Sequence, residues 1–595
     1  MIPSAMETLL DNSFIWLVPV LLPIVAAVVV LPVRSRAVSV VLAPWAALPA
    51  LVLSILPQAT RAVDVPWLLL GSRLGLDEIA RVLLFFTSVL WLTSGVYAVS
   101  YFRKNPERHR FLFFFLLAMS GNFGLILAQD MVLYYVCFAL MSFASYGLVV
   151  FNADREAVRA GRVYIALVIV GELLLFSGLV AATWTTGSTL WVGLGDRLAD
   201  ATHGNIAVAL LFGGLAIKAG VLPLHVWLPL AHPAAPAPAS AVLSGAMIKA
   251  GLIGWLRLVP LGGFVALTGW ADLCLVLGIA AAFYGVAVGI TQTNPKTVLA
   301  YSSISQMGLI TVAFGLAVSA DSPRYALAPV LAYAMHHGFA KGALFLGVGV
   351  VPAVRDAPWS RWIWSVGLLL PALALAGLPL TSGALAKSML KSQVASAPNG
   401  WPELLGVLLP IAALGTTLLM ARFLAVVWSN AQNAAATSPR GVWVSWLLLL
   451  GFAVLGVYLW PWGDDIAIGK QMCSATKIWA ASWPVICAAA IATSVNLLST
   501  RGYRLRIPCI PAGDILVVVI ATAHFVRRQC HSVTKPLLSI AASWQFGMAD
   551  HFKTIHRVLD RSQLLEALLR RSVVFGIVLL ILIGVLIGFL AIPDA

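Results

Sequence analysis

The stretch AIKAGVLPLHVWLPLAHPAAPAPASAVLSGAMIKAG, residues 216–251, contains two apolar runs around a proline-rich break, and each run carries one lysine. An ionisable side chain at bilayer depth costs roughly 3 kcal/mol or more, so it usually faces a bundle interior or water and marks an ion path. Lys218 and Lys249 are therefore the first candidates for a functional site. The alternative is a lysine that extends to the membrane surface from a helix end. Small neighbours surround Lys249 well inside its run, which makes that alternative harder there.

The helix that carries Lys218 is predicted to break soon after it, because prolines cannot donate backbone hydrogen bonds. The prolines concerned are Pro223, Pro229, Pro233, Pro236 and Pro238. Broken helices beside a charge are typical of transport sites, particularly when a second break occurs in the other half of the chain. AGLPL at 376–380 repeats most of AGVLPL at 219–224, and Lys387 follows it. A second break is therefore predicted beside Lys387.

The composition is typical of a helical membrane protein. Hydrophobic residues make up 61% of the chain and charged residues 10%, whereas soluble domains contain about 25% charged residues. The apolar runs are continuous for about 20 residues, the length of a membrane-spanning helix, and do not alternate as in outer-membrane barrels. We predict an all-α polytopic membrane protein with about 16 transmembrane helices, two inverted repeats that contain broken helices, and a C-terminal lateral amphipathic segment.

The predicted spans, within about three residues at each end, are 14–33, 38–56, 79–100, 111–128, 131–151, 163–184, 205–221, 237–260, 268–291, 297–318, 326–353, 362–386, 403–428, 442–461, 479–498 and 572–592. Basic residues concentrate in the loops after the first, third, fifth, eleventh and thirteenth spans, so these loops are predicted to be cytoplasmic and the N-terminus outside. This distribution explains the net charge of +15 better than nucleic-acid binding does.

Residues 515–526 contain only about 12 apolar residues, which are too few to cross a bilayer. We therefore predict that residues 512–571, rich in arginine and lysine, lie along the cytoplasmic face as an interfacial amphipathic helix. A solvated basic loop is the alternative. The six cysteines show no CxxC spacing, and the chain contains no P-loop or nucleophile elbow. We expect no metal, no cofactor and no catalytic centre in this chain.

Four motifs, in order, resemble a known family. KAGVLPLHVWLPLAHPAAPAPASAVLSGAMIKAG is followed by LAYSSISQMG at 299–308, HHGFAKGALFLGVG at 336–349 and LTSGALAKSMLK around Lys387. Together they resemble the antiporter-like, proton-translocating membrane subunits of complex I and its relatives. The sequences AHPAAP and SGAMIKAG are most similar to those of the large membrane subunits of formate hydrogenlyase and group 4 nickel–iron hydrogenases. The resemblance implies a bacterial inner-membrane location, other membrane subunits as partners and, through them, peripheral redox subunits.

On this resemblance we divide the chain into six parts. They are N-terminal membrane helices (1–110), a first antiporter-like repeat (111–260), a second repeat (261–428), C-terminal membrane helices (429–511), the lateral segment (512–571) and a final transmembrane anchor (572–595).

Further polar residues extend the lysine row. Lys341 lies four residues after His337 and so on the same helical face, with His336 beside it. Paired histidines can bind a metal, but without a third ligand a proton relay or a hydrogen-bonded core histidine is favoured. Lys387 completes the row, and the resemblance places His225 on the proton path.

Small polar side chains of the second motif are candidates for holding water between these groups. They are Ser302, Ser303, Ser305 and Gln306. The alternative is that they bond neighbouring helices, as serine and glutamine often do within membranes.

The sequence departs from the family at the expected glutamate. Family members carry an acid in the fifth helix in wording like WELMS, whereas this chain reads FALMS, with Ala139 at that position. The nearest acid at membrane depth is Glu172 in the sixth predicted span. We hypothesise that Glu172 supplies the displaced charge for Lys218; the alternative is that it pairs with another basic group for structure.

The leading interpretation is a proton-translocating subunit of a larger membrane redox complex of the hydrogenase-4, formate hydrogenlyase or complex I type. A second is a subunit of a multi-subunit cation/proton antiporter or an inorganic-carbon uptake complex. A third is a scaffold that has lost pumping, which only Ala139 favours.

Overall fold

The computed structural model describes residues 13–32, 36–56, 62–259, 261, 268–320, 323–350, 358–397, 400–431, 439–462, 474–501, 510–517 and 522. The predicted final span and nearly all of the predicted lateral segment lie outside these residues.

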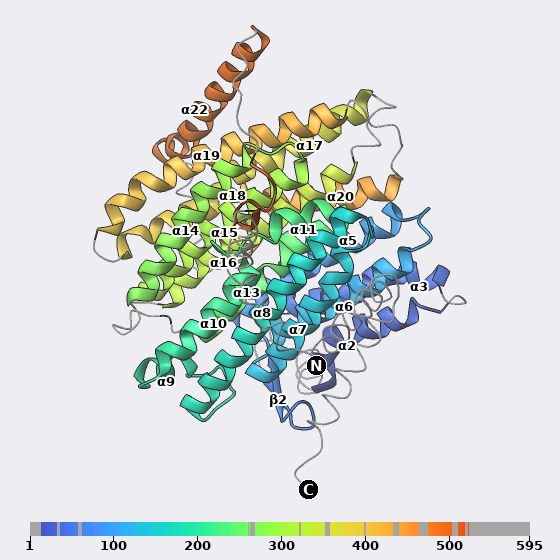
Figure 1. Cartoon of the computed structure of the whole chain (residues 1–595), viewed down its shortest axis with the longest axis vertical. Helices are drawn as coiled ribbons and strands as arrows, with labels where there is room; N and C mark the ends of the chain where they lie inside the picture. The colour runs from blue at the N-terminus through green and yellow to red at the C-terminus, as the bar shows by residue number, and fades with distance from the viewer. Residues whose placement is uncertain are drawn as a thin grey trace, which may run out of the picture.

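Helices account for almost all of the described chain (Figure 1). They are α2 (Ser13–Val29), α3 (Arg36–Leu42), η1 (Ala43–Ala47), α4 (Leu48–Ile55), α5 (Glu78–Tyr101), α6 (Arg108–Leu127), α7 (Met131–Val149), α8 (Arg155–Thr186), α9 (Leu194–Asp200), α10 (Gly204–Ala219), α11 (Leu228–Ala234), α12 (Ala237–Val242), η2 (Leu243–Met247), α13 (Lys249–Leu258), α14 (Thr268–Gly289), α15 (Pro295–Ser319), α16 (Pro323–Val350), α17 (Pro358–Ala376), α18 (Ser382–Ser392), η5 (Val394–Ser396), α19 (Trp401–Ala431), α20 (Arg440–Leu455) and α22 (Ala475–Thr500). Helices therefore occupy each predicted span from 14–33 to 479–498.

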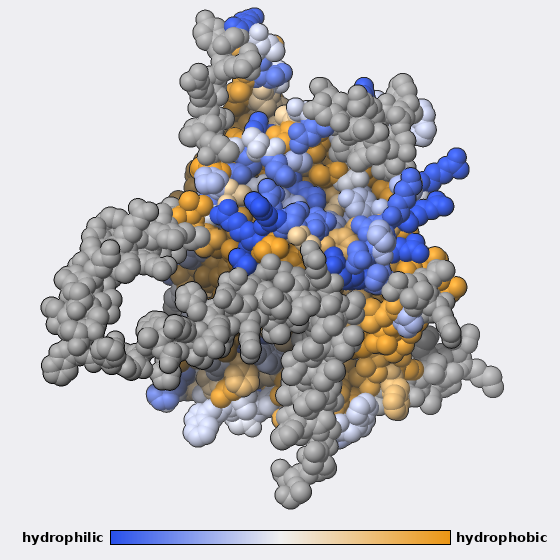
Figure 2. Space-filling view, turned by 45° about the vertical axis from the view of Figure 1, so that its right-hand side comes forward, coloured by the Kyte–Doolittle hydropathy of each residue, from blue (hydrophilic) through white to orange (hydrophobic). Residues whose placement is uncertain are grey.

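The protein is a multi-pass membrane protein. In the described part of the chain, 11 helical stretches are long and apolar enough to cross a membrane. Of these, α6 and α15 lie in the interior, with 100% and 94% of their apolar windows buried, whereas α8 and α19 are buried over only 39%. Large apolar side chains such as Leu173 and Leu448 are exposed on the outer helices. Figure 2 shows such hydrophobic surface beside a hydrophilic region on one face.

Aspartates fix where several helices begin. Asp77, Asp130 and Asp154 precede α5, α7 and α8, and each side chain accepts a hydrogen bond from the backbone N–H three residues later. Such N-caps satisfy one of the unpaired donors of the first helical turn. The cap at Asp154 explains why α8 begins at Arg155, eight residues before the predicted span.

A small β-hairpin, which the sequence patterns do not predict, precedes α5. Strands β1 (Ala62–Val65) and β2 (Ser72–Gly75) pair antiparallel. Asp130 connects the hairpin to the helices, because its Oδ2 accepts a hydrogen bond from the backbone N–H of Arg73 at 2.8 Å. Apart from this hairpin, the predicted all-α fold class is confirmed for the described residues.

Both predicted helix breaks are present and are built alike. Helix α10 ends at Gly220 (φ +72°) and α17 at Gly377 (φ +91°). In each case the next N–H bonds to a carbonyl five residues back: Val221 to Ala216 at 3.1 Å and Leu378 to Leu373 at 3.0 Å. A glycine in the left-handed conformation terminates each helix, which explains why an Ala-Gly pair occurs at both breaks.

Candidate functional site

Lys218 lies in the last turn of α10 and is 3% exposed. Its Nζ donates hydrogen bonds to Ser142 Oγ on α7 at 3.2 Å and to Tyr164 Oη on α8 at 3.3 Å. The ammonium group is therefore held inside the helix bundle by hydroxyl groups. It does not extend to the membrane surface, which was the alternative left open by the sequence.

Glu172 lies on α8 close to this lysine and is 5% exposed. Glu172, Lys218 and Ser142 line one cavity of about 10 Å³, which is room for about one water molecule. Neither carboxylate oxygen of Glu172 has a hydrogen-bond partner within the described residues. A buried carboxylate with free acceptors beside an enclosed ammonium group is suited to exchanging a proton through water.

Ala139 lies on α7 one turn before Ser142. Because residues three apart share a helical face, position 139 lies on the side of α7 that bears the hydroxyl partner of Lys218. Position 139 thus lies one helical turn from Ser142, whereas Glu172 lines the same cavity as Lys218.

Lys249 follows a π-helical turn, η2 (Leu243–Met247), in which the N–H of Ile248 bonds to the carbonyl of Leu243. Lys249 Nζ donates to Ser244 O at 2.8 Å and lies 2.7 Å from His337 Nδ1 on α16. Isolated π-turns are frequent at functional sites. Sequence reasoning missed this turn, since the i to i+5 pattern has no distinctive composition.

Two glycines bring η2 and α16 close enough for this contact. A Cβ atom on Gly245 would lie 2.9 Å from Gly338 O, and one on Gly338 would lie 2.9 Å from Gly245 O. Small residues permit such close backbone approach between membrane helices. The contact between Lys249 and His337 therefore depends on this crossing, which sequence spacing does not reveal.

Helix α16 carries the next polar groups. His336 Nδ1 lies 2.8 Å from Ser382 Oγ at the start of α18, while Lys341 Nζ donates to Leu299 O on α15 at 2.8 Å. His337 and Lys341 thus share a face, as predicted, but have different partners. Because His336 and His337 are adjacent, α16 connects the Lys249 region to the helix that carries Lys387.

Lys387 lies on α18, just after the second break. Its Nζ donates to Leu375 O and Ala376 O, both at 2.8 Å. It also lines a cavity of about 320 Å³ together with Tyr333, Lys391 and Lys477. This end of the lysine row is therefore more open than the enclosed site at Lys218.

The serines and glutamine predicted to hold water have protein partners in most cases. Ser303 Oγ lies 2.8 Å from Ser244 Oγ, and Ser305 donates to Ala282 O. Gln306 donates to Thr416 and accepts from Tyr333. Ser302 Oγ is buried with no partner in the described part of the chain, so its hydroxyl group is fully available to a water molecule. Among the described residues, no cluster of three or more His, Cys, Asp or Glu side chains is placed to hold a metal.

The two histidines that flank the first break differ. His225 is fully buried, and its Nε2 lies 3.3 Å from Asp514 Oδ2. His232 instead stacks on Phe345, with ring centroids 4.6 Å apart, and makes no ring hydrogen bond to the described residues. Asp514 was not singled out from the sequence, because its partner lies 289 positions away.

Lysines inside the bundle at two broken helices, with a third lysine that contacts a histidine, are typical of a membrane protein of the ion-translocating class. Residues 128–409 match the family described as NADH:quinone oxidoreductase/Mrp antiporter, transmembrane region. This part of the chain therefore shares the transmembrane region of that family, and the chain is an antiporter-like membrane subunit.

Two curated relatives illustrate the range of the family. Hydrogenase-4 component B of Escherichia coli is 27% identical over 335 residues, which cover 52% of this chain and 49% of the relative. A putative antiporter subunit of Staphylococcus saprophyticus is 30% identical over 359 residues, covering 55% and 44%. The chain spans about half the length of these curated relatives.

Solved structures share the fold. A chain of an archaeal respiratory complex, the membrane-bound sulfane sulfur reductase, superposes with a TM-score of 0.64 at 21% identity, covering 79% of this chain and 100% of that one. A chain of the Mrp complex from a Dietzia species superposes with a TM-score of 0.69 at 20% identity, covering 93% and 63%. Both neighbours belong to multi-subunit membrane complexes.

Proposed function

We propose that this chain is the proton-translocating antiporter-like subunit of a multi-subunit membrane redox complex, of the hydrogenase-4, formate hydrogenlyase or complex I type. The observation that supports this most directly is the row of enclosed amines. Lys218, Lys249 and Lys341 are each at most 3% exposed, and each lies within hydrogen-bond distance of a neighbouring helix.

An enclosed lysine can act as a switch because burial disfavours its charged form while a nearby carboxylate favours it. Glu172, facing the same small cavity as Lys218, is suited to that second role. The histidines of α16 extend the row toward Lys387, whose larger cavity of about 320 Å³ has room for several water molecules. Moving a charge against a membrane potential requires roughly 2.3 kcal/mol per 100 mV, so partner subunits must supply the energy.

We further propose a bacterial inner-membrane location with the N-terminus outside, which the distribution of basic residues favours. The partners are other membrane subunits of the same complex and, through them, peripheral redox subunits. The division at residues 111–260 and 261–428 into two antiporter-like repeats is supported by one broken helix in each.

The test uses the intact complex, purified through a tag on this chain and reconstituted into liposomes. Proton uptake is driven by a potassium diffusion potential and followed with an internal pH dye. Lys218→Ala is expected to lower uptake about 100-fold without changing the subunit composition. Lys104→Ala, at an exposed lysine, is the matched control. Equal uptake by wild type and Lys218→Ala would instead favour a scaffold that has lost pumping.

A cation/proton antiporter subunit is the second candidate, favoured by the similarity to antiporter subunits and to a chain of an Mrp complex. The subunits that co-purify discriminate between the two. Hydrogenase large and small subunits favour the first candidate, whereas small membrane antiporter subunits favour the second. Sodium flux in the same liposomes provides an independent measurement.

A further inference from the structure

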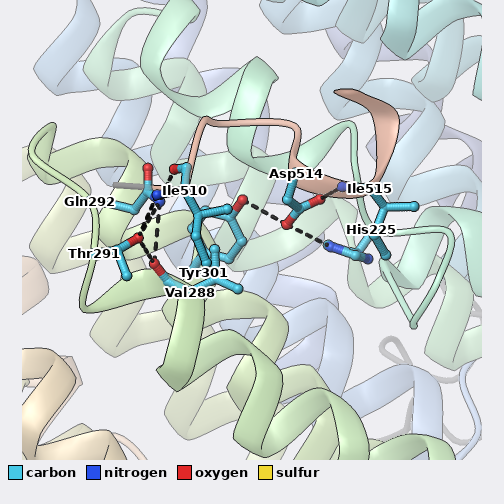
Figure 3. A network of polar contacts seen from close by, with 8 residues as sticks. All are labelled: His225, Val288, Thr291, Gln292, Tyr301, Ile510, Asp514 and Ile515. Atoms are coloured by element: carbon cyan, nitrogen blue, oxygen red, sulfur yellow. Dashed lines mark hydrogen bonds and ion pairs between the residues drawn. The ribbon is translucent and has the colours of Figure 1, made fainter. Parts of the chain in front are cut away.

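Residues 510–517, which follow α22 in the sequence, bring a carboxylate to the first helix break (Figure 3). Asp514 is 6% exposed. Its Oδ2 accepts a hydrogen bond from Tyr301 Oη on α15 at 2.8 Å and lies 3.3 Å from His225 Nε2, within the break between α10 and α11. Two segments 289 positions apart in the sequence thus meet beside the helix that carries Lys218.

Contacts other than the one between Asp514 and His225 also hold this segment in place. Gln292, in the turn between α14 and α15, donates through Nε2 to Ile510 O at 2.8 Å. The backbone N–H of Ile510 in turn donates to Thr291 Oγ1 at 3.4 Å. The carbonyl of Gln292 accepts hydrogen bonds from the Arg422 guanidinium on α19 at 2.9 and 3.1 Å. The position of Asp514 is therefore set by several elements of the bundle.

Gly513 directs the following aspartate inward. Its φ of +89° is in the left-handed region, and a Cβ atom there would lie 3.3 Å from Leu230 Cδ2 on α11. Only glycine adopts this conformation without strain. The local backbone is therefore specialised for placing the Asp514 side chain beside the break.

The hydrogen bonding of His225 is incomplete. Its Nε2 is engaged by Asp514, but its Nδ1 is buried with no partner among the described residues. The ring of Tyr284 contacts the imidazole edge-on, with centroids 5.2 Å apart. Buried polar groups usually have a partner, so this unpartnered nitrogen is available to a water molecule. An imidazole with one nitrogen on a carboxylate and the other free has the arrangement of a proton relay.

We propose that Asp514 is a proton-carrying residue of the translocation site, supplied to His225 by the segment after α22. This inference rests on the proposed function. When His225 is in its Nδ1–H tautomer, a proton taken up by the Asp514 carboxylate passes to the unprotonated Nε2, and the resulting imidazolium releases its Nδ1 proton to a water molecule in the bundle. One proton enters and one leaves, so the charge of the pair is restored once the ring returns to its first tautomer. Tyr301 holds the carboxylate in position.

The experiment measures proton uptake by the reconstituted intact complex, as above. Asp514→Asn and His225→Gln are each expected to lower uptake about tenfold or more, and the double variant no further, because the two groups act as one unit. The double variant contains a neutral pair and leaves no buried charge unpaired. Asp514→Glu, which keeps the carboxylate, is expected to recover part of the rate. Asp272→Asn is the matched control, since Asp272 bonds Trp401 at an exposed position.

Each outcome is decisive. Unchanged uptake in Asp514→Asn, or losses that multiply in the double variant, would overturn the relay while Lys218→Ala still tests the proposed function. If the role of Asp514 is purely structural, the complex that contains the double variant should assemble and take up protons at the wild-type rate. Absence of uptake by the wild-type complex would overturn the proposed function and this inference with it.

Discussion

The two helix breaks share their backbone construction but hold their lysines differently. At the first break, Lys218 precedes the left-handed glycine and is enclosed by hydroxyl groups near Glu172. At the second break, Lys387 follows the glycine and donates to two carbonyls of the interrupted helix. Lys218 thus bonds side-chain hydroxyl groups of other helices, whereas Lys387 bonds the backbone at its own break.

This difference predicts a larger loss of stability at the second break. Lys387→Ala leaves two carbonyls without their donor, at a cost of roughly 1–3 kcal/mol for each that stays unpaired. Lys218→Ala removes a donor to two hydroxyl groups, and Tyr164 Oη already donates to Ser142 O at 2.9 Å. We expect a clearly lower thermal midpoint for Lys387→Ala than for Lys218→Ala in detergent-solubilised complex. Equal midpoints for the two variants would remove the distinction between the breaks.

The next largest effect concerns the acid beside the first break. If Glu172 serves Lys218, Glu172→Gln should lower proton uptake roughly tenfold, or about 1.4 kcal/mol, with the complex still assembled. Adding Ala139→Glu should restore part of the rate, because position 139 lies one turn from Ser142, the hydroxyl partner of Lys218. Glu403→Gln, at the start of α19, is the control. Normal uptake by Glu172→Gln would eliminate the hypothesis.

The last prediction concerns the thermal stability of the two breaks and their glycines. Alanine in the left-handed conformation costs about 1–2 kcal/mol, so both Gly220→Ala and Gly377→Ala should lower the thermal midpoint. Gly220→Ala should lower the stability more than Gly377→Ala. The new Cβ at position 220 would overlap Leu228 Cδ1, whereas at position 377 the nearest atom is Lys387 Cδ at 2.9 Å, in a flexible side chain. Gly406→Ala, inside α19 with open space around it, should be neutral or slightly stabilising. A larger loss at Gly377 would contradict the comparison.

Much of the site was predictable because it depends on local chemistry. Lysines within apolar runs, prolines after Lys218 and the repeated Ala-Gly wording are enough to identify both breaks. The proposed link between Glu172 and Lys218 began as a hypothesis from the sequence, and the cavity that both line makes it specific enough to test.

Other features were not predictable, because they join distant segments. The β-hairpin is short and lacks the alternation of a typical strand, and part of its support comes from Asp130. The π-turn before Lys249 and the pairing of His225 with Asp514 depend on which helices cross. The contact of residues 510–517 with the first break likewise joins segments that are far apart in the sequence.

The sequence by itself determined that this chain is a helical membrane protein with amines at bilayer depth, because hydrophobic run length and proline position act within one segment. Only the tertiary structure decided which amines meet which partners. Lys249 contacts His337 because η2 and α16 approach closely at Gly245 and Gly338. Asp514 contacts His225 because the segment after α22 packs against the first break. The physical reason is that hydrogen bonds extend only about 3 Å, so their pairing is fixed by packing and not by order along the chain.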